Sequence, residues 1–440
     1  MPWPPRSAYL HIPFCHRRCF YCDFPVVPLG DRAGAASGQS GAASIAAYLA
    51  LLQREIALAP EGPPLSTIYF GGGTPSLLLP AQVGDLLAQL AGHFGLAPGA
   101  EITLELDPAS FDQARLEAYL AAGVNRVSLG GQSFDDAVLA SLGRRHRRSD
   151  LLAATRWLAQ ARLQGGLASW SLDLIQAVPG QTTELWREQL RLAIAVGAPH
   201  LSVYDLSIEP GTVFAWREQR GELSLPDADL AADLMELTAA ELAAAGYGHY
   251  EVSNYARPGH ASRHNRVYWS GAGWWGFGMG ATEAPRGQRQ ARPRTREAYQ
   301  HWLEQQGAEA ARAPAPEPDP DPDPDPDPDA WLEDQLIVGL RCREGVRPHD
   351  LLIAAGLAPP RALQALGDLR RRLGLEFQRG LVLLEGPRWR LSDPAGLALS
   401  NAVLRECLLW WECWRGDAVA GPASPAAPAP PMTGQPATGG

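Results

Sequence analysis

The sequence contains no lysine, because all 38 of its basic residues are arginine. This absence excludes Schiff-base enzymes, pyridoxal-phosphate enzymes and phosphate-binding loops of the Gly-Lys-Ser type. No apolar run approaches the roughly 20 residues that a membrane span needs. The first residues also lack the charged-then-apolar pattern of a signal peptide. We therefore expect a cytoplasmic protein with no integral membrane span.

Cysteine is scarce, with six residues among 440. In a cytoplasmic protein such cysteines are more often metal ligands or reduced thiols than disulfides. Most of the formal net charge of -10 comes from one segment, in which Glu317 and the six aspartates from Asp319 to Asp329 supply seven negative charges. The rest of the chain is nearly balanced, so the charge indicates no nucleic-acid partner, and we expect none.

The first 250 residues alternate short apolar runs with amphipathic stretches, in a chain long enough for about two to three domains. The runs have the length and composition of buried strands. They are Ser7–Ile12, Thr67–Phe70, Glu101–Glu105, Arg126–Leu129, Trp170–Ile175 and Leu201–Val203.

Helices are predicted between these strands. One of them places Ile45, Leu49, Leu52 and Ile56 on a single face, and a second places Leu185 and Leu192 together. A further helix is expected over 227–245, before Gly246. Six strand-then-helix units predict an α/β fold with a parallel sheet, either a partial (β/α)6 barrel or an open doubly wound sheet.

The alternation stops near residue 300, and the composition then changes. We expect a barrel over 1–250 and a segment that closes it over 251–312. Residues 313–329 alternate proline with alanine or acidic residues, which predicts an extended polyproline-II linker. Residues 330–415 predict a small, mainly helical domain of winged-helix type, with a strand-like run over 380–384. The Ala/Pro/Gly-rich tail over 416–440 is expected to be disordered.

Three cysteines lie close together directly after the first strand. Cys15, Cys19 and Cys22 have the spacing Cys-x3-Cys-x2-Cys, whereas Cys342, Cys407 and Cys413 lack ligand spacing and are expected to be buried thiols. Three thiolates can each bind one iron of a 4Fe-4S cluster and leave the fourth iron open to an external ligand. A zinc site is the alternative, with His11 or His16 as the fourth ligand.

Residues 9–22, which read YLHIPFCHRRCFYC, resemble the cluster loop of radical S-adenosylmethionine (SAM) proteins. The closer resemblance is to the coproporphyrinogen III oxidase-like branch, which includes heme chaperones of the HemW type. It extends to about residue 300 and resumes in the C-terminal domain. It implies a 4Fe-4S cluster on Cys15, Cys19 and Cys22, whose open iron binds SAM.

Polar residues follow several predicted strands, where a barrel places its ligand-binding side chains. Glycines 71–73 directly follow the second strand and let a ligand approach the backbone, although a plain tight turn would look the same. Arg144 could pair with the SAM carboxylate. Alternatively, it is part of a solvated basic loop. By resemblance, the SAM-contacting residues are Tyr9, Tyr21, Gly72, Gly73, Thr74, Glu105, Gln132, Arg144 and Asp173, with Ser207 as a weaker candidate.

The run His264-Asn265-Arg-Val-Tyr268-Trp269 resembles the heme-binding motif of these chaperones. A neutral imidazole can ligate heme iron, and aromatic rings offer flat apolar surfaces to a porphyrin. A buried core histidine with aromatic packing is the alternative. After the following glycines, 281–283 read Ala-Thr-Glu where the family has Ala-His-Ser.

Two features favour a chaperone over an oxidase. Phe24 stands where the porphyrinogen dehydrogenases have a fourth cysteine, and the cluster loop begins by Tyr9, without the long preceding segment of those enzymes. The leading hypothesis is a heme chaperone that passes heme to acceptor proteins, with a flavodoxin or ferredoxin-type electron donor. The alternatives are an oxygen-independent coproporphyrinogen III dehydrogenase and a zinc-stabilised binding module.

Overall fold

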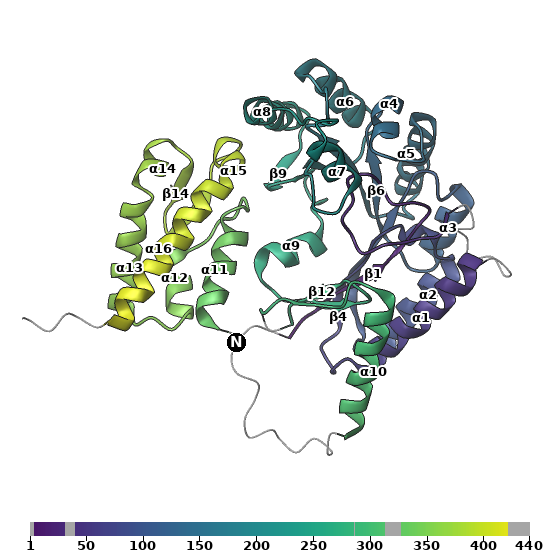
Figure 1. Cartoon of the computed structure of the whole chain (residues 1–440), viewed down its shortest axis with the longest axis horizontal. Helices are drawn as coiled ribbons and strands as arrows, with labels where there is room; N and C mark the ends of the chain where they lie inside the picture. Colours follow the sequence, from purple (N-terminus) through teal and green to yellow (C-terminus); the bar gives the residue numbers. More distant parts are fainter. Residues whose placement is uncertain (1–3, 31–39, 286, 313–326, 421–440) are drawn as a thin grey trace, which may run out of the picture.

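The computed structural model describes residues 4–30, 40–285, 287–312 and 327–420. A barrel-like α/β part carries most of the chain, and a smaller helical part from the C-terminal region lies beside it (Figure 1). The α/β fold with a parallel sheet, predicted from the sequence, is confirmed. Within the described residues, no helix is long and apolar enough to cross a membrane.

All six predicted strands are present and lie side by side in chain order. Because each strand pairs in parallel with the one before it, every β-α-β step moves in the same direction around the sheet. A doubly wound sheet would reverse direction, so that alternative is excluded. The strands are β1 (Ser7–Ile12), β4 (Leu65–Gly72), β5 (Leu96–Leu106), β6 (Arg126–Gln132), β7 (Ser169–Gln176) and β8 (His200–Asp205).

The segment after residue 250 extends both edges of this sheet. Strand β11 (Trp275–Phe277) pairs in parallel with β1, and β10 (Asn254–Ala256) and β9 (Gly248–Glu251) add antiparallel strands beside β8. In the described part of the chain the nine-stranded sheet therefore ends at β11 and β9 and does not close on itself.

Helices surround the sheet on its outer side (Figure 1). The predicted face of α1 is confirmed, because Ile45, Leu49, Leu52 and Ile56 are all buried. The face predicted for α6 is wrong, since Leu185 is 55% exposed while Trp186 is buried. The outer helices are α1 (Ser40–Leu58), α2 (Pro80–Phe94), α3 (Gln113–Ala121), α5 (Arg148–Leu163), α6 (Thr183–Ala195) and α8 (Ala228–Ala244).

A buried ion-pair network fastens the segment after β11 to helix α1. Glu55 of α1 accepts hydrogen bonds from Arg292 at 2.7 Å and from the Tyr299 hydroxyl at 2.6 Å. Tyr299 lies on α10 (Arg296–Arg312), which packs against α1. Arg292 also pairs with Glu283 at 2.8 Å. The glutamate that departs from the family pattern therefore balances a buried arginine.

The C-terminal part has its own apolar core. Its elements are α11 (Pro328–Gly339), α12 (Pro348–Ala354), α13 (Pro359–Arg372), α14 (Gly374–Gln378), β14 (Val382–Glu385), β15 (Arg388–Leu391), α15 (Ala395–Ala398) and α16 (Ser400–Ala420). It contacts the barrel chiefly where α11 packs against α9 (Arg263–Ser270). Cys407 is buried as predicted, but Cys342 is half-buried and Cys413 is exposed.

Two of the predicted domain boundaries fall inside helices of the structure. Helix α11 begins at Pro328, two residues inside the expected linker, because Asp327 caps its first turn. Helix α16 continues to Ala420, beyond the expected start of the tail at 416. Residues 313–326 of the expected linker and 421–440 of the expected tail lie outside the described residues.

Candidate functional site

A cavity of about 450 Å3 lies at the carboxyl ends of the parallel strands. This is the end at which barrels of this kind build their ligand sites. The cavity contains nearly all the residues that the sequence singled out for cluster and SAM binding. They are Cys15, Cys19, Tyr21, Cys22, Gly72, Gly73, Thr74, Glu105, Gln132, Arg144, Asp173 and Ser207.

The three loop cysteines all line this cavity. Burial raises the pKa of the Cys15 thiol to about 12 and also raises that of Cys22, so a thiolate there needs a bound cation. Each thiolate of a 4Fe-4S cluster binds a different iron, so the three need not converge on one point. The cavity therefore fits a cluster on Cys15, Cys19 and Cys22.

A mononuclear zinc site has less support. Within the described ranges, no three His, Cys, Asp or Glu side chains are grouped so that they could hold one ion. His11, one proposed zinc ligand, has both ring nitrogens engaged by other groups. Its Nε2 contacts the Pro25 carbonyl oxygen at 2.9 Å, and its Nδ1 contacts the Tyr9 hydroxyl at 3.0 Å.

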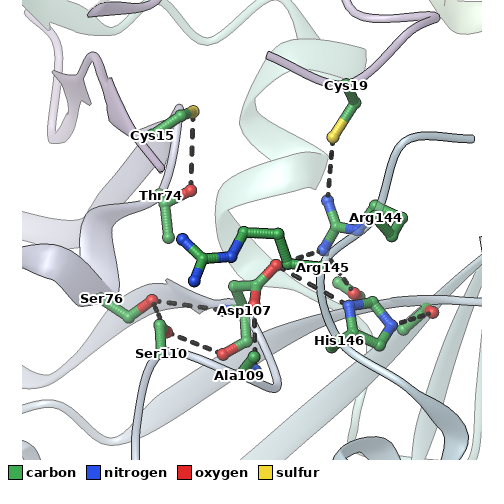
Figure 2. A network of polar contacts seen from close by, with 12 residues as sticks. Cys15, Cys19, Thr74, Ser76, Asp107, Ala109, Ser110, Arg144, Arg145 and His146 are labelled. Carbon is green, nitrogen blue, oxygen red and sulfur yellow. Dashed lines mark hydrogen bonds and ion pairs between the residues drawn. The ribbon is translucent and has the colours of Figure 1, made fainter. Parts of the chain in front are cut away.

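Arg144 lies beside the cluster loop and is bound by a carboxylate of the protein itself. Its guanidinium pairs with Asp107 at 2.6 Å and lies 3.7 Å from the Cys19 sulfur (Figure 2). The reading as a merely solvated basic loop is wrong, because the Arg144 side chain is largely buried. The expected pairing with the SAM carboxylate would have to share the guanidinium with Asp107.

Asp107 was missed in the sequence, although it directly follows β5. Burial alone would raise its pKa, but the Arg144 charge holds the pKa of the carboxyl well below its usual range. Asp107 is therefore ionised at neutral pH, and the arginine beside the cysteines is neutralised from within the protein.

Glu105 lines the cavity at the end of β5. It accepts a hydrogen bond from the Tyr69 hydroxyl at 2.9 Å and one from the backbone amide of Gly72 at 3.1 Å. Burial, partly offset by the Tyr69 hydrogen bond, raises the pKa of the Glu105 carboxyl to about 7. This residue therefore changes charge near neutral pH.

Asp173, on β7, has an unused acceptor. Its Oδ2 accepts a hydrogen bond from Ser128 at 2.8 Å, whereas the buried Oδ1 has no hydrogen-bond partner within the structure. Burial raises the pKa of the Asp173 carboxyl to about 6. An unsatisfied buried oxygen is costly unless a ligand donates to it. A ligand with hydroxyl or ammonium donors, such as SAM, fits this position.

Replacing Glu105 with glutamine is expected to alter the pH dependence of stability. A carboxyl whose pKa rises from 4.5 to about 7 on folding holds its proton more tightly when folded. The free energy of unfolding therefore falls as the pH rises through this interval, by up to roughly 3 kcal/mol.

Urea unfolding at a series of pH values tests this expectation. The wild type should lose stability across the interval, and Glu105→Gln should lose distinctly less. The matched control is Glu222→Gln, which removes an exposed carboxylate paired with Arg220. The assignment to Glu105 is wrong if its variant declines as steeply as the control.

Gly72 allows β4 to pass close to His11. Its φ is +115°, and a methyl group there would lie 2.6 Å from the His11 ring. Gly246 also has a positive φ, of +84°, but faces open space. We expect Gly246→Ala to cost about 1 kcal/mol for backbone strain and Gly72→Ala to cost clearly more. If the two variants lose equal free energy of unfolding in urea, the His11 ring moves aside without an energetic cost.

Tyr9 is the one expected SAM contact that does not line this cavity. Its ring packs against Tyr69 at 6.1 Å, and its hydroxyl contacts His11. Tyr9 lines a second cavity instead. Tyr9 is the register partner of Tyr69, which does line the first cavity, so strand alternation does not separate them; the Tyr9 hydroxyl is instead engaged by His11.

The expected heme motif lies on helix α9, and none of its residues lines the first cavity. His264 is fully buried, and burial lowers its pKa to about 3, so the ring is neutral. Its Nδ1 contacts the Thr67 hydroxyl at 2.7 Å, and its Nε2 contacts the Tyr268 hydroxyl at 2.9 Å. The expectation that His264 is open to a heme iron is not met, because both ring nitrogens already have partners.

The other motif residues are less enclosed. Asn265 and Trp269 are half-buried on α9. Neither lines the first or the second cavity, whereas Tyr268 lines the second. Besides Asp107, the sequence interpretation missed Tyr69 and Ser128. Their hydroxyls donate hydrogen bonds to the carboxylates of Glu105 and Asp173.

The fold and the site together define the class. A partial barrel with three cysteines on the loop after its first strand, facing a cavity at the strand ends, is the arrangement of a radical SAM protein. The radical SAM superfamily profile matches residues 9–193. This superfamily implies a 4Fe-4S cluster and SAM.

Comparison with known proteins narrows the class. The chain is 40% identical to the heme chaperone HemW of Synechocystis sp. over 410 residues, which cover 91% of this chain and 95% of that protein. It is 42% identical to HemW of Mycobacterium tuberculosis, with coverage of 64% and 70%. The chain belongs to the HemW family.

A solved structure supports the fold over nearly the whole length of this chain. Coproporphyrinogen III oxidase (HemN) from Escherichia coli superimposes with a TM-score of 0.72, covering 94% of this chain and 91% of that one. The two sequences are 21% identical, so this likeness concerns the fold alone.

Proposed function

We propose that this protein is a cytoplasmic heme chaperone that binds heme and transfers it to acceptor proteins. The observation that carries the proposal is the 40% identity to a HemW heme chaperone along 95% of that protein's length. The aligned region covers 91% of this chain and includes both the barrel and the C-terminal part, so the proposal concerns the whole chain.

The first cavity is proposed to hold the cluster and SAM. Cys15, Cys19 and Cys22 would bind three irons of a 4Fe-4S cluster. Bound there, a cluster and SAM would supply one-electron cleavage of the sulfonium, with electrons from a flavodoxin or ferredoxin-type donor. A second group of residues would position SAM, namely Tyr21, Gly72, Gly73, Thr74, Glu105, Gln132, Arg144 and Asp173.

The protein's own groups give this site its charge balance. Asp107 neutralises Arg144 next to Cys19. The free oxygen of Asp173 would accept a donor of SAM. Glu105 would accept another donor once it is ionised, so SAM should bind more tightly above pH 7 than below pH 6.

An oxidase reaction on coproporphyrinogen III is the second candidate, because the fold is shared with HemN. Phe24 argues against it. This residue stands where the dehydrogenases have a fourth cysteine, and its ring is 54% exposed.

Anaerobically reconstituted holoprotein tests the proposal. Hemin should bind with a saturable change in absorption and pass to an apoprotein acceptor, such as apomyoglobin, faster than hemin bound to serum albumin does. Coproporphyrinogen III, with SAM and a reductant, should remain unchanged. Formation of protoporphyrinogen IX, or failure to bind hemin, would overturn the chaperone proposal.

A further inference from the structure

Two of the cluster cysteines have a hydrogen-bond donor of the protein beside their sulfur atoms (Figure 2). The Thr74 hydroxyl lies 3.6 Å from the Cys15 sulfur, and Nη1 of Arg144 lies 3.7 Å from the Cys19 sulfur. Hydrogen bonds to the sulfurs and the charge around a cluster are among the factors that set its reduction potential. Both donors therefore lie where they can influence a cluster on these cysteines, and of the two Arg144 brings a charge.

The Arg144 guanidinium is held in place from its other side. Its Nη2 donates to the Asp107 carboxylate at 2.6 Å and to the Gly130 carbonyl at 3.0 Å, which leaves Nη1 for the Cys19 sulfur. The side chains of Arg144 and Asp107 are 13% and 20% exposed, so solvent screens this pair weakly. The carboxylate and the carbonyl together therefore fix the position of the guanidinium beside Cys19.

Asp107 is itself fixed by uncharged groups directly after β5. Its Oδ1 accepts a hydrogen bond from the Ala109 amide at 3.0 Å, and its own amide donates to the Ser76 hydroxyl at 3.2 Å. The Ser110 hydroxyl donates to the Asp107 carbonyl at 2.7 Å (Figure 2). His146 Nδ1 lies 3.9 Å from the carboxylate, which is beyond hydrogen-bond distance. The backbone around Asp107 thus directs its carboxylate at the guanidinium.

The charge of this pair matters because reduction adds one negative charge to a cluster. A positive charge beside the cluster favours the reduced state and raises the reduction potential, and a negative charge lowers it. An unpaired Arg144 would therefore raise the potential, whereas the charges of Arg144 and Asp107 cancel. The pair donates an N–H group to the Cys19 sulfur without adding a net charge next to it.

Resting on the proposed cluster site, we propose that Asp107 is a positioning residue for the cluster. It holds the Arg144 guanidinium at the Cys19 sulfur and cancels its charge, and it thereby keeps the reduction potential low. A low potential suits a cluster that must give up an electron to a sulfonium. This role is separate from the binding of iron, which falls to the three cysteines.

A potentiometric titration of the anaerobically reconstituted holoprotein, without SAM, tests the role of Asp107. Electron paramagnetic resonance of the reduced cluster gives the potential, which a merely structural role of Asp107 would not shift. Asp107→Asn leaves the Arg144 charge uncancelled and should favour reduction by roughly tenfold, which is about 59 mV for one electron. Arg144→Met leaves the Asp107 charge and should shift the potential to lower values. Asp350→Asn, at an exposed carboxylate near Arg347, is the matched control and should have the wild-type potential.

A double variant separates the charge from the hydrogen bond. Asp107→Asn with Arg144→Met is as neutral as the wild-type pair but lacks the N–H donor at Cys19. Its potential should lie below that of the wild type and above that of Arg144→Met alone. Because it leaves no buried charge without a partner, it also tests the pair if Asp107→Asn alone does not fold. Equal potentials of the double variant and Arg144→Met would then overturn the proposal.

The outcomes distinguish the role of Asp107 from the function on which it rests. If the reconstituted wild type holds no cluster, the proposed cluster site fails. If it holds one, and the Asp107 and Arg144 variants all have the wild-type potential, only the role of Asp107 fails. A lower potential in Asp107→Asn would also overturn that role, because an uncancelled positive charge favours reduction.

Discussion

Cys19→Ser is expected to abolish the iron–sulfur cluster. A serine hydroxyl is a far poorer iron ligand than a thiolate, and the two remaining thiolates cannot retain the cube. The reconstituted wild type should contain about four irons and four sulfides per chain and absorb broadly in the visible range. The variant should contain little of either and lose this absorption.

Cys413→Ser is the matched control. It makes the same chemical change at an exposed cysteine on α16, and it should leave iron, sulfide and absorption unchanged. Far-ultraviolet circular dichroism of both variants should match the wild type, because Cys19 lies on a loop outside the sheet. A Cys19→Ser protein that keeps its full iron content would refute the cluster assignment.

The fold was largely predictable because the strands are apolar on both faces. In a parallel sheet covered by helices, a buried strand is a short apolar run, and all six such runs became strands. Helix α6 shows where this reading fails. Leu185 and Leu192 share a helical face by spacing, but the bulkier Trp186 determines which face packs inward, and the sequence does not reveal what lies opposite.

The first cavity was predictable for a similar reason. Glu105, Gln132 and Asp173 follow apolar strands, and parallel strands bring their carboxyl ends to one edge. No pattern in the sequence identifies the partner of a buried charge. The pairs of Arg144 with Asp107 and of Glu283 with Arg292 depend on tertiary contacts, and so does the burial of His264.

The motif on α9 illustrates the limit of motif reading. Its histidine was the expected iron ligand, because a neutral imidazole can ligate heme iron. In the structure His264 is buried, and its two ring nitrogens contact the hydroxyls of Thr67 and Tyr268. These contacts depend on the tertiary arrangement and cannot be read from the spacing of the motif.

Asp107→Asn is expected to lower the free energy of unfolding by about 3 to 5 kcal/mol, because it leaves the largely buried Arg144 charge unpaired. Urea unfolding at neutral pH measures this loss. Asp350→Asn removes an exposed carboxylate near Arg347 and should cost less than about 1 kcal/mol. A comparable loss in the two variants would contradict the prediction.

The pH dependence and a double variant test the same pair independently. Because the folded pKa of Asp107 is depressed, its contribution is fully present above pH 4, near the ordinary aspartate value, and is lost as the pH falls towards the folded value. Asp107→Asn should therefore lose less stability in acid than the wild type. Adding Arg144→Met should recover part of the neutral-pH loss, since no charge then remains buried without a partner. A double variant less stable than Asp107→Asn would mean that Arg144 stabilises the fold chiefly through the Gly130 carbonyl and the Cys19 sulfur.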